Sequence, residues 1–363
     1  MRQPAGLFDP PNLGAAAILF RMPFLAVAFG VPTMAQALAE LPRVAREAQL
    51  IELRLDLFEE AYDLAALLEA RATTPVVVTL RPTNEGGRSA LSAAARRAEL
   101  LGAAELGAEY VDLEWDAVTP DALAHLHAAG VQVILSRHDF AAMPAELASG
   151  WPADLAARGA DVVKVVGLAR DVRDCLPPLR ALRQAQQPTV AIAMGDPGLP
   201  TRVLALRERS CFLTYGAPAA LPGTAPGQLT LAELREVYHA ERLGPSTAVY
   251  GLLGPHVETE RAAEYNRWFR ETNRDAVAVP FPCTTAAAAT VRGFRELPVA
   301  GWHVHGEALQ RDVLNALDDL ERSAQAQAKV NAIVTRVGSL VGSWVETPAE
   351  QFELWTGSQP VLA

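Results

Sequence analysis

Short apolar runs alternate with helical segments over the first two thirds of the chain. The segments between the runs, such as 90–106 and 171–186, are rich in Ala, Leu, Arg and Glu, a composition typical of helices. Eight runs predict strands, at 23–30, 50–58, 75–82, 110–115, 131–140, 161–169, 188–195 and 211–217. Eight such units in about 220 residues predict an α/β fold, a closed parallel (β/α)8 TIM barrel. An open doubly wound sheet is the alternative, weakened because no G-x-G-x-x-G motif follows any run.

A second, smaller α/β unit is predicted after the barrel. Residues 218–230 are rich in Pro and Gly, a helix is predicted over 231–243, and a Gly-Pro-Ser sequence at 244–246 interrupts the pattern. Four further strands are predicted, at 248–254, 276–282, 301–305 and 330–336. We therefore divide the chain into an N-terminal extension (1–22), a barrel (23–243) and a smaller α/β domain (248–363).

Composition narrows the class of protein. The 32 basic and 42 acidic residues give a net charge of −10, which argues against a nucleic-acid partner. Cys175, Cys211 and Cys283 lie far apart, so neither a disulfide framework nor a cysteine-based zinc site is expected. No charge-free apolar run reaches the roughly 18 residues of a membrane span, and the N-terminus does not resemble a signal peptide. A cytoplasmic protein with no membrane partner is expected.

Polar residues gather at the C-terminal ends of the predicted strands, where barrels of this kind hold their active sites. They are Glu52, Arg54, Asp56, Arg81, Glu85, Asp112, Glu114, Ser136, His138, Asp139, Lys164, Arg202, Thr224 and Gln228. Alternation along a strand lets Glu52, Arg54 and Asp56 all point inward. Val, Ile and Leu normally fill a barrel interior, so this many charges require ion-pair partners or a ligand.

Lys164 is the most informative of these residues. Only two of the 32 basic residues are lysines, and Lys164 lies in the interior of a predicted strand, whereas Lys329 lies in a polar stretch. Burial between valines should lower the pKa of Lys164, and a neutral amine in a barrel can form a Schiff base with a ketone or aldehyde. The alternative is a structural salt bridge from Lys164 to Asp112 or Glu114.

His138 is the natural acid/base, because the ordinary pKa of histidine lies near neutrality. Glu85 is placed to orient its ring. The alternative for His138 is a buried structural histidine. Arg54, Arg81 and Arg202 form a cationic set that suits a carboxylate substrate, unless each is simply solvated or ion-paired.

Seven motifs in order make residues 23–240 similar to type I 3-dehydroquinate dehydratase, the Schiff-base enzyme of the shikimate pathway. They are Glu-Leu-Arg-Leu-Asp (52–56), Thr-Leu-Arg-x-x-x-Glu-Gly-Gly (79–87), Val-Asp-Leu-Glu (111–114), Ser-Arg-His-Asp-Phe (136–140), Asp-Val-Val-Lys (161–164), Met-Gly-x-x-Gly-x-x-x-Arg (194–202) and Ala-Pro-Gly-Gln (225–228). Thr201 and Thr224 stand where the family often has Ser, and both keep a hydroxyl.

The resemblance implies a dehydration of 3-dehydroquinate to 3-dehydroshikimate and water. Lys164 would form an imine with the C3 ketone. His138 would remove the C2 proton and then protonate the leaving C1 hydroxyl, with Glu85 positioning its ring. The alternatives are another class I Schiff-base lyase or aldolase, and a non-catalytic pathway scaffold or metabolite-binding protein.

The resemblance also implies a set of substrate-binding residues and the absence of any metal or cofactor. The substrate carboxylate would be held by Arg202 and Gln228, assisted by the Thr224 hydroxyl, and the ring hydroxyls by Glu52, Arg54 and Arg81. We also expect the chain to form a homodimer.

Residues 248–346 resemble the substrate-binding N-terminal domain of shikimate dehydrogenase. The shared segments are Tyr-Gly-Leu-Leu-Gly (250–254), Glu-Tyr-Asn (264–266), Val-x-Val-Pro-Phe (277–281), Gly-Trp-His-Val (301–304) and Val-Asn-Ala-Ile-Val (330–334). Leu309 aligns with the catalytic lysine of that family, and no nicotinamide-binding domain is expected. The unit is therefore expected to be degenerate and non-catalytic. His303 and His305 alternate on a strand, but two ligands without a third make a metal site improbable.

Overall fold

The first unit is a parallel barrel. The computed structural model describes residues 22–219, 221–225, 227–256, 258–297 and 299–360, so nearly all of the predicted extension lies outside the described residues. All eight predicted barrel strands are present: β1 (Phe24–Phe29), β2 (Leu50–Arg54), β3 (Val76–Thr79), β4 (Tyr110–Glu114), β5 (Gln132–Asp139), β6 (Val162–Leu168), β7 (Thr189–Met194) and β8 (Leu213–Tyr215). They pair in parallel in the order β7-β6-β5-β4-β3-β2-β1-β8. Thr189 closes the ring by a parallel bridge to Cys211.

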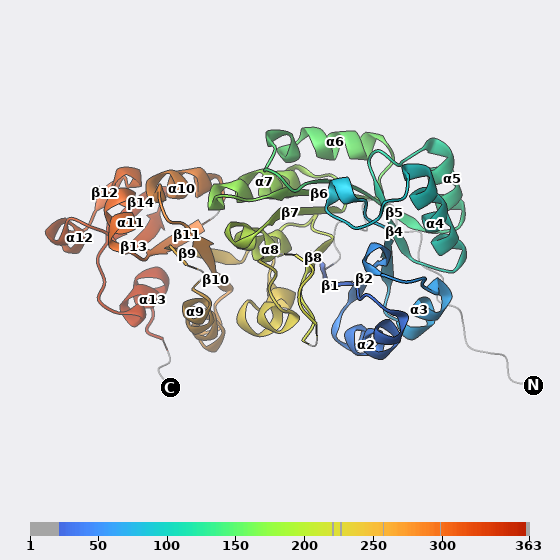
Figure 1. Cartoon of the computed structure of the whole chain (residues 1–363). Coiled ribbons are helices and arrows are strands. Elements are labelled where there is room, and N and C mark those ends of the chain that lie inside the picture. The colour runs from blue at the N-terminus through green and yellow to red at the C-terminus, as the bar shows by residue number, and fades with distance from the viewer. Residues whose placement is uncertain (1–21, 220, 226, 257, 298, 361–363) are drawn as a thin grey trace, which may run out of the picture.

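Helices cover the outside of the barrel (Figure 1). They are α2 (Met34–Glu47), α3 (Leu64–Ala70), α4 (Ala93–Glu105), α5 (Pro120–Ala128), α6 (Gly150–Ala157), α7 (Leu176–Gln184) and α8 (Leu199–Leu204). The side chains of Thr33, Asp63, Ser92 and Thr119 accept a hydrogen bond from the first turn of α2 to α5 and so fix where these helices begin. The helix predicted over 231–243 is broken into a π-turn at Glu233–Val237 and a 3-10 turn at Ala240–Arg242.

The barrel interior is apolar apart from the C-terminal end of its strands. Its core is formed by Phe24, Ala26, Leu50, Val77, Tyr110, Ile134, Val162, Val166, Val190, Ile192, Met194, Phe212, Leu213 and Tyr215. Buried polar residues lie on the same strands, among them Glu52, Thr79, Asp112, Ser136 and Lys164. The charges expected inside the barrel are therefore present and removed from solvent.

The second unit contains a six-stranded mixed sheet in the order β10-β9-β11-β13-β14-β12. The strands are β9 (Ala248–Gly254), β10 (Ala276–Pro282), β11 (Val299–Val304), β12 (Asp319–Leu320), β13 (Ala332–Arg336) and β14 (Ser339–Ser343). Its helices are α9 (Thr259–Glu271), α10 (Ala287–Gly293), α11 (Glu307–Asp312), α12 (Arg322–Gln327) and α13 (Pro348–Thr356). The four strands predicted here are present, whereas β12 and β14 were not predicted. The sheet is mixed because β13 runs antiparallel to both of its neighbours.

The two units pack against each other along α7 and α8 of the barrel (Figure 1). Arg180 forms an ion pair with Glu296 at 2.7 Å, and Arg183 donates to the Glu296 carbonyl oxygen at 2.5 Å. One hydrophobic cluster of buried residues runs from the outer layer of the barrel into the second unit. The division of the chain into separate domains at 243–248 therefore stays a prediction.

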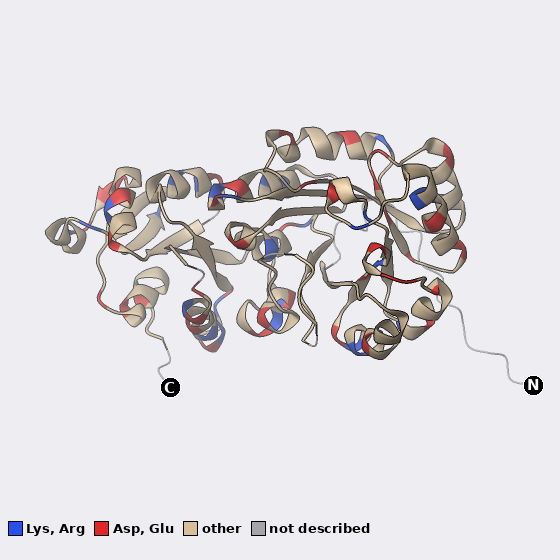
Figure 2. Cartoon of the chain, in the orientation of Figure 1, with Lys and Arg blue, Asp and Glu red and all other residues tan. Residues whose placement is uncertain are grey.

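Charged residues are interspersed over the outer helices of both units, acidic beside basic (Figure 2). With a net charge of −10, a small molecule stays the expected partner. In the described part of the chain, no helix combines the length and the apolar composition that crossing a membrane requires.

Candidate active site

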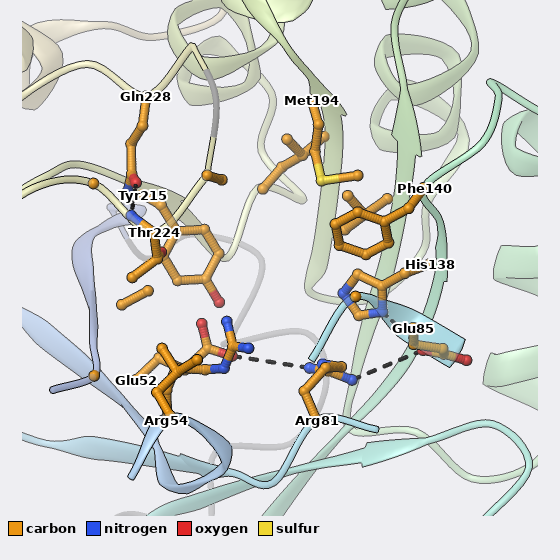
Figure 3. Close-up of a pocket in the computed structure, with 18 of the residues that line it drawn as sticks. Glu52, Arg54, Arg81, Glu85, His138, Phe140, Met194, Tyr215, Thr224 and Gln228 are labelled. Carbon is orange, nitrogen blue, oxygen red and sulfur yellow. Dashed lines mark hydrogen bonds and ion pairs between the residues drawn. The ribbon is translucent and has the colours of Figure 1, made fainter. Parts of the chain in front are cut away.

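A cavity of about 440 Å³ opens at the C-terminal ends of the barrel strands. All of the predicted catalytic and substrate-binding residues line it: Glu52, Arg54, Arg81, Glu85, His138, Lys164, Arg202, Thr224 and Gln228. One side of the cavity carries Glu85, His138 and Phe140, and the opposite side carries Tyr215, Thr224 and Gln228 (Figure 3). The fold thus brings together residues that are up to 176 positions apart, from Glu52 to Gln228, while their roles stay predictions.

Lys164 lies among buried oxygen atoms. Its Nζ is 3.0 Å from Glu52 Oε1, 2.8 Å from Asp112 Oδ2 and 3.0 Å from the Tyr215 hydroxyl. Burial alone would lower the pKa of Lys164, but the carboxylates of Asp112 and Glu52 outweigh burial and raise this pKa above its ordinary value. The prediction that Lys164 is a neutral amine in the free protein was therefore wrong. The predicted alternative, an ion pair with Asp112, is present, and Glu52 joins it.

Arg81 balances the acidic residues beside Lys164. Its Nη1 donates to Glu114 Oε1 at 2.9 Å and to Ser136 Oγ at 2.6 Å, and its Nη2 lies 2.6 Å from Asp112 Oδ2. These side chains are almost completely buried, and such charges are tolerated in a protein interior only when paired. Glu114 is held by Arg81 and also by Arg96, at 3.2 Å, instead of by Lys164.

His138 and Glu85 form a buried pair, with His138 Nδ1 2.9 Å from Glu85 Oε2. Burial lowers the pKa of His138 well below its ordinary value, and the positive charges of Arg81 and Lys164 add to this effect. Burial also raises the pKa of Glu85 to about 8. The imidazole is therefore neutral near neutral pH, as a general base must be.

The two positions that follow Glu85 leave no room for a side chain, which explains why both are glycine. Gly86 has a φ of +76°, and a Cβ there would lie 2.1 Å from the Phe140 ring. A Cβ on Gly87 would lie 2.0 Å from the Arg81 carbonyl oxygen. Only glycine lets this loop pass so close to both neighbours, and the loop in turn places Glu85 against His138. The Glu-Gly-Gly motif is thus explained by packing.

Arg54 is oriented by Asp56, which accepts two hydrogen bonds from its guanidinium at 2.9 and 2.8 Å. β2 ends at Arg54, and Asp56 lies in the 3-10 turn Leu55–Leu57. The expectation that alternation along one strand aims Asp56 inward was wrong, because the strand ends first. Asp56 also accepts hydrogen bonds from the backbone N–H groups of Arg81 and Arg88, so it fixes the loop after β3 as well.

Arg202 lies in α8, all of whose residues are buried. Burial lowers the pKa of Arg202 to about 10, which leaves it charged at neutral pH. Thr201 ties α8 to β7, because its hydroxyl accepts from the Ala193 N–H at 3.2 Å and donates to the Gly198 carbonyl oxygen at 2.8 Å. Thr214 of β8 donates to the Arg202 carbonyl oxygen at 2.8 Å. Arg202 is therefore held by two strands of the barrel.

Thr224 and Gln228 lie in the loop after β8. The Gln228 Oε1 accepts a hydrogen bond from the Thr224 N–H at 3.0 Å, which closes this part of the loop on itself. Thr224 is exposed and Gln228 is half-buried. Both therefore lie at the mouth of the cavity, while Lys164 lies at its floor.

Sequence reasoning assigned no role to several residues that line the cavity, among them Phe140, Met194 and Tyr215. Phe140 and Met194 stand inside the family-like motifs, and their place there was the available signal. Tyr215 stands in a short apolar strand, where a tyrosine resembles ordinary core packing. Its contact with Lys164 depends on the closure of the barrel and has no local signal.

No group of three or more His, Cys, Asp or Glu side chains in the described ranges is arranged to hold a metal ion. His303 donates to or accepts from the Tyr265 hydroxyl at 2.9 Å, and His305 lies 3.8 Å from Glu258. Each of the two histidines thus lies beside a polar side chain of the protein.

The fold and the cavity define a (β/α)8-barrel protein with a lysine, a histidine–carboxylate pair and several arginines at the C-terminal ends of its strands. Residues 25–245 match the family model described as type I 3-dehydroquinase, and the chain belongs to this family. A 3-dehydroquinate dehydratase of Methanopyrus kandleri is 35% identical over 197 residues, covering 53% of this chain and 88% of the relative.

Longer relatives extend the similarity beyond the barrel. A bifunctional 3-dehydroquinate dehydratase/shikimate dehydrogenase of Arabidopsis thaliana is 30% identical over 307 residues, covering 81% of this chain. This chain spans 50% of the length of that relative. The region after the barrel thus resembles the N-terminal domain of shikimate dehydrogenase, while its degeneracy stays a prediction.

Solved structures share the fold. The 3-dehydroquinate dehydratase of Geobacillus kaustophilus has a TM-score of 0.55 at 24% identity, covering 59% of this chain and 88% of that one. The dehydroquinate dehydratase and shikimate dehydrogenase portion of S. pombe AroM has a TM-score of 0.51 at 23% identity, covering 90% of this chain and 65% of that one. At these identities the likeness concerns the fold alone.

Proposed function

We propose that the chain dehydrates 3-dehydroquinate to 3-dehydroshikimate and water through a Schiff base on Lys164. The observation that carries the proposal is the position of the Lys164 amine at the floor of a cavity that also holds the His138–Glu85 pair. Membership of the type I 3-dehydroquinase family supplies the substrate class.

The carboxylates around Lys164 suit a cationic imine. An ammonium and a ketone give a protonated imine and water, so the positive charge beside Glu52 and Asp112 is the same before and after the reaction. The carboxylates that raise the pKa of Lys164 therefore stabilise the starting ammonium and would stabilise the iminium product as well. The iminium draws electrons from the neighbouring carbon and acidifies its C–H bond.

His138 is the group that would remove the C2 proton and return a proton to the leaving C1 hydroxyl. Its pKa is lowered by burial, so the ring begins neutral. For Nε2 to accept a proton, Nδ1 must carry one, and Glu85 must accept the hydrogen bond from Nδ1. Arg202 and Gln228 would hold the substrate carboxylate with the Thr224 hydroxyl, while Glu52, Arg54 and Arg81 would contact the ring hydroxyls.

Trapping the imine tests this proposal. Protein mixed with 3-dehydroquinate and borohydride should become inactive and carry one adduct, which peptide mapping should locate on Lys164. Lys164→Arg should be inactive in an absorbance assay for the conjugated product, because a guanidinium stays protonated and cannot attack a carbonyl. Lys329→Arg is the matched control and should keep full activity. No adduct, or an adduct on Lys329, would contradict the mechanism.

For the second unit we propose a packing role without dehydrogenase chemistry. Leu309 occupies the position that aligns with the family's catalytic lysine, and its hydrocarbon side chain, buried in the apolar core, has no group that can transfer a proton. Protein incubated with NADPH and 3-dehydroshikimate should show no oxidation of the cofactor, and measurable reduction would overturn this part. The homodimer and the cytoplasmic location stay predictions.

A further inference from the structure

Tyr215 is the one uncharged group among the three side chains that accept a hydrogen bond from the Lys164 amine. An ammonium has three N–H bonds, and Glu52, Asp112 and the Tyr215 hydroxyl each lie within 3.0 Å of Nζ. The centre of the Tyr215 ring is 5.1 Å from the same nitrogen. One face of the reacting atom is therefore covered by a phenol.

The position of Tyr215 is fixed by the barrel. Tyr215 ends β8 in register with Ala26 of β1, and the N–H of Gly216 donates to the Ala26 carbonyl oxygen at 2.8 Å. Its ring packs in the barrel interior and is 7% exposed, and the residue lines the cavity (Figure 3). The hydroxyl is thus within reach of both the lysine and a molecule in the cavity.

Tyr215 holds its own proton. Burial raises the pKa of the phenol, and the negative charge of Glu52 adds to that effect. The two carboxylates differ in this respect, because Asp112 and Glu52 both have lowered pKa values and carry no proton to donate. Of the three groups that contact Nζ, Tyr215 alone can accept one proton and donate another at the same time.

Imine formation requires such an exchange. The Lys164 ammonium must lose a proton before its lone pair can form a bond to the ketone carbon, and the ketone oxygen must gain a proton as its π bond breaks. The resulting carbinolamine must then lose a second N–H proton and deliver it to the same oxygen, so that the C–O bond breaks, water leaves and the C=N bond forms. Both protons of the water come from the original ammonium, so the step balances without a co-reactant.

We propose that the Tyr215 hydroxyl is a catalytic group that relays these protons from Lys164 Nζ to the ketone oxygen. Tyr215 gives its O–H proton to the oxygen while it takes an N–H proton from Nζ, and so ends each transfer unchanged. The proposal rests on the proposed dehydratase function and assigns the imine-forming step to Tyr215, leaving the C2 proton transfer to His138.

The test measures imine formation separately from elimination. His138→Ala is the parent variant, because imine can form on Lys164 but the C2 proton stays in place. Samples mixed with 3-dehydroquinate are quenched with borohydride at successive times, and the adduct is followed by intact mass. Adding Tyr215→Phe should slow adduct formation about 100-fold, the lower end of what positioned proton transfer contributes. The final amount of adduct should match the parent, because a relay changes a rate and not an equilibrium.

Tyr110→Phe in the same parent is the control. Tyr110 packs in the same barrel interior at the start of β4, the end of the barrel opposite to the cavity, and this change should leave the trapping rate unaltered. Replacing Tyr215 by 3,5-difluorotyrosine keeps a hydroxyl in place but lowers its pKa. This replacement should also change the rate of adduct formation.

Equal trapping rates for the parent and Tyr215→Phe, or an unaltered rate with difluorotyrosine, would overturn the relay and leave Glu52 or water as the proton carrier. Absence of any adduct in wild-type protein would instead remove the dehydratase proposal, and the relay with it.

Discussion

The protonation of Glu85 should control activity around neutral pH. Burial raises the pKa of Glu85 to about 8, while that of His138 falls well below its ordinary value. The O–H of a protonated Glu85 donates a hydrogen bond to Nδ1, so the hydrogen of the neutral ring is on Nε2, where the base must be free. An ionised Glu85 accepts from Nδ1–H and frees Nε2. The competent form therefore appears as the pH rises through about 8.

The magnitude follows from the pKa. Two pH units below its pKa, a carboxyl group is only about 1% ionised, so kcat/KM for 3-dehydroquinate should be roughly 100-fold lower at pH 6 than on its plateau above pH 9. The measurement is the absorbance of the conjugated product between pH 5.5 and 9.5. Because kcat/KM reports the free enzyme, the profile tests the unliganded structure directly.

Two variants sharpen this test. Glu85→Gln cannot ionise, and its amide oxygen can accept from Nδ1–H at every pH, so its profile should be flat over this range with a lower plateau. Glu105→Gln is the control, since Glu105 ends α4 with a side chain that is 69% exposed, and it should keep the wild-type profile. A wild-type profile that is already flat between pH 6 and 8 would refute the reasoning.

The same pKa shift predicts an effect on stability. A carboxyl group whose pKa is raised on folding, here from 4.5 to about 8, contributes stability that is fully present below 4.5 and lost as the pH rises through about 8. Glu85→Gln removes this dependence. The melting temperature of the variant minus that of the wild type should therefore be larger at pH 9 than at pH 5. Thermal denaturation of both proteins at the two pH values measures this difference.

Two further substitutions and one truncation should have measurable effects on activity or stability. His138→Ala should lose about 10²–10⁴-fold in turnover while the imine is still trapped; near wild-type turnover would reject its assignment. Gly86→Ala should lower the free energy of unfolding by about 1–2 kcal/mol through its positive φ, with a further loss from the contact to Phe140; urea denaturation measures both, and unchanged stability would contradict the steric argument. Ending the chain at Pro245 should keep dehydratase chemistry but lower the melting temperature, and an unchanged value would remove the packing role of the second unit.

The fold could be predicted from the sequence where local pattern decides it. The barrel strands are runs of Val, Ile and Leu that are buried on both faces, and such runs are visible without any partner. β14 was missed because Ser339–Ser343 holds two Ser and one Gly among its five residues, and its burial comes from β13 and β12 on either side. The helix predicted over 231–243 failed at His239, whose φ of +51° ends the helical path.

The residues that form the site could be predicted from the sequence, but the charges that surround each of them could not. Lys164 stands between valines, so its burial is visible in the sequence and a lowered pKa follows from burial alone. The carboxylates that reverse this shift come from β2 and β4, 112 and 52 residues away along the chain. Tyr215 was missed for the same reason, because β8 meets β6 only across the closed barrel. What the sequence leaves out is which charges face each other.

The packing of α8 links the second unit to the candidate site. A helix on the outside of a barrel normally keeps a polar face toward solvent, yet every residue of α8 is buried. The cause is β10, the edge strand of the second sheet, which lies against α8.

The outer edge of β10 is closed to further strands. The side chain of Asn266 pairs with both the N–H and the carbonyl oxygen of Ala278. By alternation Pro280 and Pro282 take the next outward positions, where proline has no N–H to leave unpaired. An edge finished in this way is suited to pack against a helix rather than to pair with another strand. Since α8 also carries Arg202, the second unit packs against the helix that presents this arginine to the cavity, whether or not that unit binds a ligand of its own.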